Sequence, residues 1–377
     1  MILAGELLAI AFMGLIAAAA NKTGVTLLLF PELAALSHDV LTRPQGKWAS
    51  QPLRLILTPT LTAVAGLLIT QHAHYGAIPM LLILLAGLAV IRLLRSSIGP
   101  ALSAGMLPMV LDERHWMYPL AICIGLTGLV LLLWMWQRYG ASIEVITEEP
   151  KGASIDDALE INPTGRFWLF HLLGFVLVLS VVGQWTGLRF ILFPPLVVMA
   201  YEILGHPELP GWMKRPALFP LACFLTASVG VLAYRSLSGG VAGVVVTVVV
   251  SILLLRLFRI HLPPALAVGL LPFVMTAPNG WYPVSVALGT STLSVFFRGR
   301  GWLMKWSSFL HYATGCEGRV EIESGWTARR SERASGKTQC CNETAPLKPK
   351  QGLTGPPAAN LVVPQYSKPY PSSRSIL

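Results

Sequence analysis

Long stretches with very few charged residues run along most of this chain, and they constrain its fold more than any other feature. Each approaches the roughly 20 residues that a helix needs to span about 30 Å of hydrocarbon. They are continuously apolar rather than alternating, which disfavours a transmembrane β-barrel. The eight longest are 2–20, 53–70, 76–94, 118–136, 167–182, 217–234, 239–257 and 282–297. The sequence therefore predicts an all-α, polytopic transmembrane helical bundle.

The second half of the chain repeats the first. Arg92 and Arg95 are followed by the same spacing of Pro, Gly and Tyr residues that follows Arg256 and Arg259. Further matches are Pro100 with Pro264, Gly105 with Gly269, Pro108 with Pro272, Tyr118 with Tyr282, Gly24 with Gly187, Pro31 with Pro194, Trp48 with Trp212, and Gly66 with Gly230. Drift toward Leu and Val alone would not align Arg with Arg or Trp with Trp. A duplicated, proline-punctuated apolar unit is typical of transporters built from repeats.

Four shorter apolar runs, at 25–40, 100–111, 188–204 and 263–275, accompany the long ones and either cross or re-enter the membrane. If all twelve cross, one side keeps only Lys22, Arg114, Arg189 and Arg235, and every other Lys and Arg falls on the opposite side. The basic side faces the cytoplasm. We therefore predict a multi-pass protein of the cell (inner) membrane with both termini cytoplasmic. Six crossings per half is an even number, so the two repeats have the same orientation.

Composition predicts four parts. These are a first transmembrane repeat (1–137), an acidic cytoplasmic linker (138–166), a second transmembrane repeat (167–297) and a basic, largely disordered cytoplasmic tail (298–377). Loops and tail explain most of the net charge of +10, so the expected partner is the lipid bilayer and not a nucleic acid. The five cysteines show no metal or disulfide spacing. A homo-oligomer is left open.

Two short segments begin with proline and are candidates for a solute site. The runs 100–111 and 263–275 are too short to span a bilayer as helix alone, and Pro100, Pro263 and Pro264 suit a helix start. Backbone N–H groups at such a start, together with Arg92, Arg95, Arg256 and Arg259, would suit an anion. Arginines at i and i+3 share one helix face. The alternative is that these arginines only anchor the orientation of the helices.

Two acidic residues are candidates for carrying a coupling ion. Glu32 lies inside the apolar run 25–40, and Glu202 lies inside 188–204. An ionisable residue in a membrane segment indicates function by default, although either residue could instead lie hydrated near an interface. His261 is a candidate for proton handling, and a packing role for it is the alternative.

No catalytic or nucleotide-binding motif occurs in the sequence. There is no H-E-x-x-H, no G-x-S-x-G and no Gly-rich phosphate loop. We therefore expect no enzyme activity and no cofactor. The prediction is a transporter or channel for a small anionic solute. A non-transporting membrane scaffold or sensor, whose basic tail recruits a partner, remains an alternative.

The segment His261-Leu262-Pro263-Pro264-Ala265, with the arginine-bearing helix end and the Phe-Pro segment before it, resembles the HPP family of integral membrane proteins. The resemblance covers about 23–136 weakly and 186–297 better, as two tandem units. The sequence departs from the family's His-Pro-Pro motif by Leu262, and its first half has Ser97-Ile98-Gly99-Pro100. The resemblance implies transport, with a nitrite-like anion as one candidate solute. The duplicated layout also resembles the fusaric-acid-resistance and aromatic-acid efflux family, which implies an organic-acid exporter.

Overall fold

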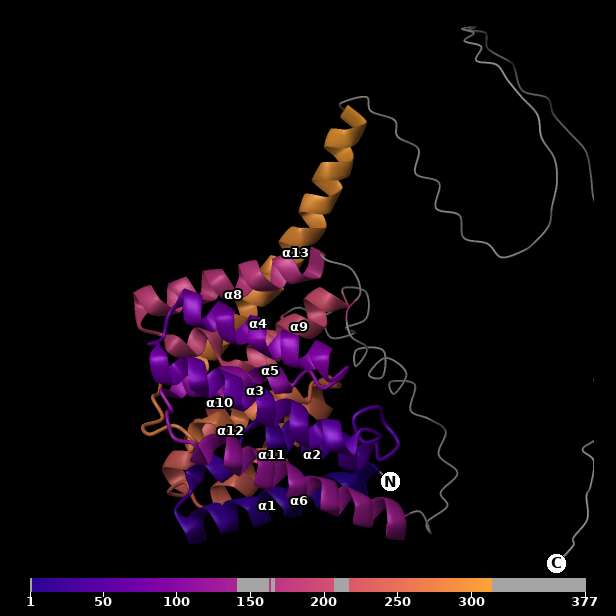
Figure 1. The fold of residues 1–377 in the computed structure, drawn as a ribbon, viewed down its shortest axis with the longest axis vertical. Helices are drawn as coiled ribbons and strands as arrows, with labels where there is room; N and C mark the ends of the chain where they lie inside the picture. The colour runs from indigo at the N-terminus through magenta and orange to yellow at the C-terminus, as the bar shows by residue number, and fades with distance from the viewer. Residues whose placement is uncertain (1, 141–162, 164–166, 207–216, 314–377) are drawn as a thin grey trace, which may run out of the picture. The chain divides into compact units, whose positions relative to one another are not determined.

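A computed structural model describes residues 2–140, 163, 167–206 and 217–313. Within these residues every regular element is a helix, as the apolar runs predict (Figure 1). Six helices are long and apolar enough to cross a membrane. They are α1 (Ile2–Thr23), α3 (Pro52–His72), α6 (Met117–Gly140), α8 (Phe167–Thr186), α10 (Leu218–Ser236) and α11 (Val241–Phe258). The chain is a polytopic helical membrane protein.

The remaining helices include the short ones that the proline-rich runs predict. They are α2 (Glu32–Thr42), α4 (Ala77–Leu93), α5 (Ala101–Leu111), α9 (Pro194–Gly205), α12 (Pro264–Leu270) and α13 (Tyr282–Ala313), with the 3-10 turns η1 (Thr26–Leu28), η2 (Arg189–Leu192) and η4 (Leu271–Phe273). Helix α13 continues past the predicted boundary at residue 297. The linker is largely outside the described residues, as is the tail beyond 313.

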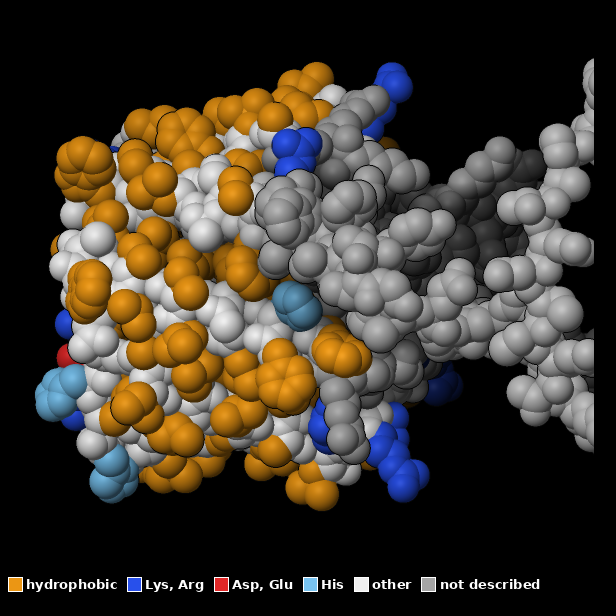
Figure 2. Space-filling view, turned by 90° about the horizontal axis from the view of Figure 1, so that it is seen from above, with side chains coloured by type: hydrophobic (Ala, Val, Ile, Leu, Met, Phe, Trp, Pro, Cys, Tyr) orange, Lys and Arg blue, Asp and Glu red, His pale blue; other side chains and the backbone are white. Residues whose placement is uncertain are grey.

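The short helices are buried and the long helices are partly exposed. Every residue of α12 and nearly every residue of α5 and α9 is buried. The long helices instead expose large apolar side chains, such as Leu15, Phe170 and Leu253. Figure 2 shows hydrophobic side chains over most of one face of the molecule. Lipid cannot satisfy the free backbone groups of a broken helix, so the broken segments must lie inside the protein.

The two halves of the chain interlock within one unit, residues 1–317. Helix α3 packs against α4, α5 and α6, and α10 packs against α11, α12 and α13. Between the halves, α1 packs against α11 and α2 against α12, while α8 packs against α4 and α9 against α5. Helices at corresponding positions therefore have corresponding neighbours, and α1 and α8 lie on opposite sides in Figure 1. We call the contact region of α1 and α2 with α11 and α12 the seam.

Two pairs of glycines let the short helices approach their long neighbours closely. A Cβ atom on Gly66 of α3 would overlap the carbonyl oxygen of Gly105 on α5. A Cβ atom on Gly230 of α10 would overlap the carbonyl oxygen of Gly269 on α12 in the same way. Small residues at helix crossings permit this packing in membrane proteins, where dispersion contacts replace the hydrophobic effect.

A second proline lies inside α5 and another lies in η4 just after α12, and a tyrosine offsets the cost of each. Pro108 lacks the N–H that would bond to the carbonyl of Ala104, four residues earlier. The hydroxyl of Tyr118 donates a hydrogen bond to that carbonyl instead, at 2.6 Å. Pro272 likewise frees the carbonyl of Val268, and the Tyr282 hydroxyl donates to it at 2.7 Å.

The segment containing α5 runs from one end of α3 to the other. Before α5, the carbonyl of Ser97 accepts a hydrogen bond from the Trp48 indole, which precedes α3. After α5, the carbonyl of Arg114 accepts one from Gln71, at the C-terminal end of α3. A re-entrant segment would return to its starting side, so these contacts favour crossing. Residues 96–100, which lie before α5 and are buried, form non-helical backbone in this crossing.

Candidate functional site

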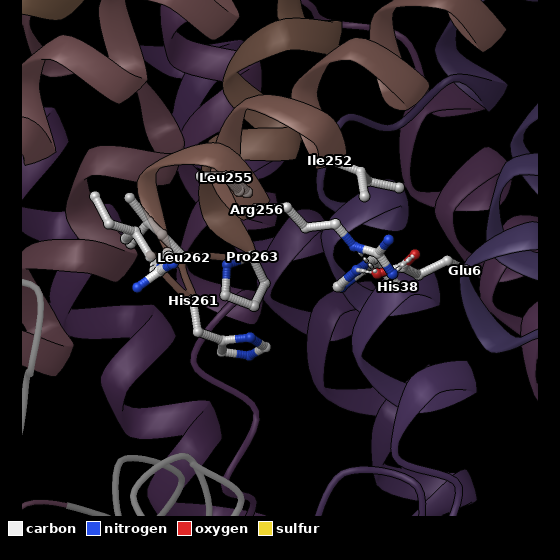
Figure 3. A pocket seen from close by; sticks show the side chains of 10 residues that line it. Glu6, His38, Ile252, Leu255, Arg256, His261, Leu262 and Pro263 are labelled. Atoms are coloured by element: carbon white, nitrogen blue, oxygen red, sulfur yellow. Dashed lines mark hydrogen bonds and ion pairs between the residues drawn. The ribbon is translucent and has the colours of Figure 1, made fainter. Parts of the chain in front are cut away.

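A pocket of about 280 Å³ lies at the seam (Figure 3). The first half of the chain contributes Glu6 from α1 and His38 from α2. The second half contributes the end of α11 and the segment leading to α12: Ile252, Leu255, Arg256, Arg259, Ile260, His261, Leu262 and Pro263. We call this the seam pocket. It combines basic, acidic and apolar side chains from both halves.

An ion pair across the seam forms one wall of the pocket. The Arg256 Nε donates to Glu6 Oε1 at 3.1 Å, and Nη2 pairs with Oε2, so the contact is bidentate. His38 Nε2 lies 3.7 Å from the same Oε1. Glu6 is only 6% exposed, so its charge needs these partners. The pair therefore neutralises Arg256 and links α1 to α11.

Two histidines and a second arginine also line the pocket. The His38 and His261 ring centroids are 6.4 Å apart, and in Figure 3 both side chains lie beside the pocket. His38 Nδ1 is buried without a hydrogen-bond partner among the described residues. Arg259 is exposed and has no ion-pair partner in the part of the chain that the structure describes. No described residue therefore neutralises its positive charge in the way that Glu6 neutralises that of Arg256.

The predicted shared helix face of the arginine pairs is wrong. Helix α4 ends at Leu93 and α11 at Phe258, so Arg95 and Arg259 lie just beyond their helices. Both have left-handed backbone, with φ of 48° and 54°. The next N–H in each case donates back to a carbonyl five residues earlier, at 2.9 and 3.0 Å. This is the usual left-handed termination of a helix, here with arginine in place of glycine.

The backbone N–H groups at the starts of α5 and α12 do not point at open space, contrary to the sequence-based expectation. Ala101 and Leu102 donate to the carbonyls of Ile98 and Gly99. Ala265 and Leu266 donate to those of Leu262 and Pro263, at 3.0 Å each. Chain geometry at the preceding turn closes these bonds locally. An anion in the seam pocket would therefore be held by side chains.

Only part of the predicted site comes together. Arg256, Arg259, His261 and Pro263 line the seam pocket, and Pro264 is buried behind it at the start of α12. Arg92, Arg95 and Pro100 do not line it.

The corresponding contact region, of α8 and α9 with α4 and α5, holds aromatic side chains. Tyr201 stands where the sequence match places His38, and its ring packs edge-to-face against Trp168, with centroids 5.6 Å apart. Arg92 interacts electrostatically with Tyr201. The two halves therefore differ in chemistry at this position.

The two acidic candidates have different environments. Glu32 is 2% exposed, and neither carboxyl oxygen has a hydrogen-bond partner among the described residues. Glu202 is only partly buried and has an interaction partner. Burial without a partner therefore distinguishes Glu32.

Sequence reasoning missed Glu6 and His38 as site residues. One sequence feature could have identified Glu6: it is the one charged residue in the apolar run 2–20. A charged residue within a membrane segment indicates a functional role or an ion pair. Its partner Arg256 lies 250 residues away in the sequence. No local pattern connects two residues at that separation.

No family model, curated protein or solved structure matches this chain.

Proposed function

We propose that this protein transports a small anionic solute across the cell membrane and binds it in the seam pocket. One observation carries the proposal: Arg259, which has no ion-pair partner among the described residues, and two histidines line a pocket built from both halves of the chain. Transporters built from repeats place their sites where the repeats meet, because relative movement of the halves then changes access to the site. We also propose that the chain is an internal duplication, that both termini are cytoplasmic and that the protein is a member of the HPP family.

The roles of the pocket residues follow from their pairing. Arg256 is bound to Glu6, so it fixes the seam rather than the solute. Arg259 supplies the positive charge, and a guanidinium binds oxyanions with two parallel hydrogen bonds. His38 and His261 add ring N–H donors, and protonation of either increases the positive charge of the pocket.

The test uses purified protein in liposomes with nitrite, acetate and benzoate as probes. Arg259→Gln should weaken binding of the transported probe about tenfold to hundredfold, because a charge-assisted contact contributes about 1.5–3 kcal/mol. Arg259→Lys should be intermediate, since it retains the charge and loses the planar fork. Calorimetry measures the affinity, and isotope or fluorescence flux measures transport.

Arg95→Gln is the matched control. Arg95 has the same left-handed backbone as Arg259 and lies outside the seam pocket, so its loss should leave affinity unchanged. Equal affinity in wild type and Arg259→Gln would reject the pocket as the solute site. Transport of benzoate but not of nitrite or acetate would favour the organic-acid exporter. Deletion of residues 315–377, which lie outside the described residues, should leave solute flux intact. If the wild-type protein transports none of the three probes, the alternative of a non-transporting scaffold is favoured.

A further inference from the structure

Glu32 is the most unusual buried group in the described part of the molecule. It is the first residue of α2 and is 2% exposed. Both carboxyl oxygens are shielded from solvent and lack hydrogen-bond partners among the described residues. The matching residue of the second half is Pro195. Among the described residues Glu32 is therefore the one carboxyl of this kind, and neither the ion pair nor the seam pocket involves it.

Among the described residues no basic side chain pairs with Glu32, and the one group that favours its negative charge is its own backbone N–H at the start of α2. Helix α2 packs against α1, α6 and α12. Helix α12 has no ionisable side chain. In α1, Glu6 pairs with Arg256 and lies near His38, which is six residues after Glu32 in α2. The ionisable groups that interact with Glu32 are Tyr118 and Tyr282. Both donate their hydroxyl hydrogens to backbone carbonyls, of Ala104 and Val268.

An ionised carboxylate is strongly unfavourable in such a place, because it has lost water and gained no counter-charge. The neutral acid fits better, since its charge is absent. A metal cation fits poorly, because Na⁺-like or Ca²⁺-like ions need several oxygen ligands, and the described residues form no cluster of three or more His, Cys, Asp or Glu side chains. The proton is therefore the ion that this site suits.

We propose that Glu32 is a proton-binding site whose occupancy depends on the arrangement of the two halves. Loading forms an O–H bond between a water-derived proton and the carboxylate, and unloading returns that proton to water. Helix α2 belongs to the first half and packs on α12 of the second, so water reaches Glu32 only when this contact opens. An ion that binds one arrangement better than the other shifts the balance between them.

Binding of the proton stands by itself, whereas its use in transport rests on the proposed function. In a transporter with solute in the seam pocket, Glu32 would couple solute movement to a proton gradient, because the same opening of the two halves exposes both sites.

Infrared spectroscopy of the full-length protein in liposomes tests proton binding without any knowledge of the solute. At neutral pH the wild-type minus Glu32→Gln difference spectrum should contain the carbonyl stretch of a protonated carboxylic acid. A spectrum with carboxylate bands only would overturn the proposal. Glu6→Gln is the matched control and should show loss of a carboxylate, since Glu6 is paired with Arg256.

A second measurement covers the case in which Glu32→Gln fails to insert. The carboxylic-acid band of the wild type should shift on transfer to D₂O and should disappear after reaction with a hydrophobic carbodiimide. Mass spectrometry should then find the adduct on Glu32. A protonated-acid band that persists while Glu32 carries the adduct would assign the band to another residue and overturn the proposal.

Flux measurements test the coupling. Glu32→Gln should lose uptake driven by a proton gradient and retain exchange of labelled for unlabelled solute, because exchange needs no change in protonation. Full gradient-driven uptake in this variant, or uptake in wild type driven by Na⁺ instead, would overturn the coupling. Absence of any solute flux in wild type would reject the proposed function and leave the infrared result unaffected.

Discussion

At the scale of single residues, this protein places proline at buried positions and supplies the missing hydrogen bond from elsewhere. Tyr118 and Tyr282 each donate to the carbonyl that a proline four residues later leaves free. In an apolar interior an unpaired carbonyl is costly. The pairing therefore explains why a tyrosine follows each proline-containing short helix at the same spacing.

Tyr118→Phe should destabilise the protein by about 0.6–2 kcal/mol, the range for hydrogen bonds inside membrane proteins. The loss should be much smaller when Pro108→Ala is also present, because the alanine N–H can then bond to the Ala104 carbonyl. Unfolding in mixed detergent micelles measures both differences. Equal losses in the two backgrounds would show that the tyrosine does not compensate for the proline.

The ion pair at the seam gives a second prediction at this scale. Arg256→Gln should destabilise the protein by about 1–3 kcal/mol, because it leaves the buried carboxylate of Glu6 without its main partner. Glu6→Gln in the same molecule should recover part of that loss, since no buried charge then remains. A double-mutant cycle by thermal unfolding measures the coupling. A coupling energy near zero would mean that solvent screens the pair, because the Arg256 side chain is 46% exposed.

At the scale of elements, close packing of short helices on long ones determines where the broken segments lie. Gly66→Ala and Gly230→Ala should each destabilise the bundle by about 1–3 kcal/mol or prevent folding, because the new methyl group meets backbone that cannot move away. Gly174→Ala is the control, since an ideal Cβ there has no atom within 4 Å. Size-exclusion chromatography and thermal unfolding in detergent measure the effect. Normal folding of both crossing variants would contradict the glycine contacts.

The helices could be predicted from the sequence because apolar length and proline position are local properties. The predicted helix bounds are less accurate where a proline lies inside an apolar run. The sequence predicts one segment over 25–40, whereas in the structure Pro31 lies between the turn η1 and helix α2. The sequence also predicts one segment over 263–275, whereas Pro272 removes a helical hydrogen bond and α12 is followed by the 3-10 turn η4.

The candidate site was only partly predictable for a different reason. Arg256, Arg259, His261 and Pro263 were found because they lie within eight residues of one another beside a helix end. Glu6 and His38 join them only through packing of α1 and α2 on the other half. Likewise, the exposure of Arg259 and the pairing of Arg256 depend on where α11 ends, which a helical spacing rule does not reveal.

At the scale of the whole molecule, basic residues and hydrogen bonds define two ends of the bundle. Arg114 lies beside Gln71 at the C-terminal end of α3, and Arg235 at the C-terminal end of α10 lies near Gly280. Arg95 and Arg259 lie at the ends of α4 and α11, next to the segments that enter α5 and α12. The excess of arginine and lysine at this second end predicts that it faces the cytoplasm.

Accessibility of single cysteines checks this orientation in intact cells, in a variant from which the native cysteines have been removed. His74→Cys and Thr276→Cys lie in exposed connections at the first end and should react with a membrane-impermeant maleimide added outside. Ser50→Cys is exposed before α3 at the second end and should react only after the cells are opened. The same result at residues 74 and 276 is required because an even number of crossings gives both halves one orientation. Labelling of residue 50 from outside would invert the topology, and opposite results at 74 and 276 would show that the halves are inverted relative to each other.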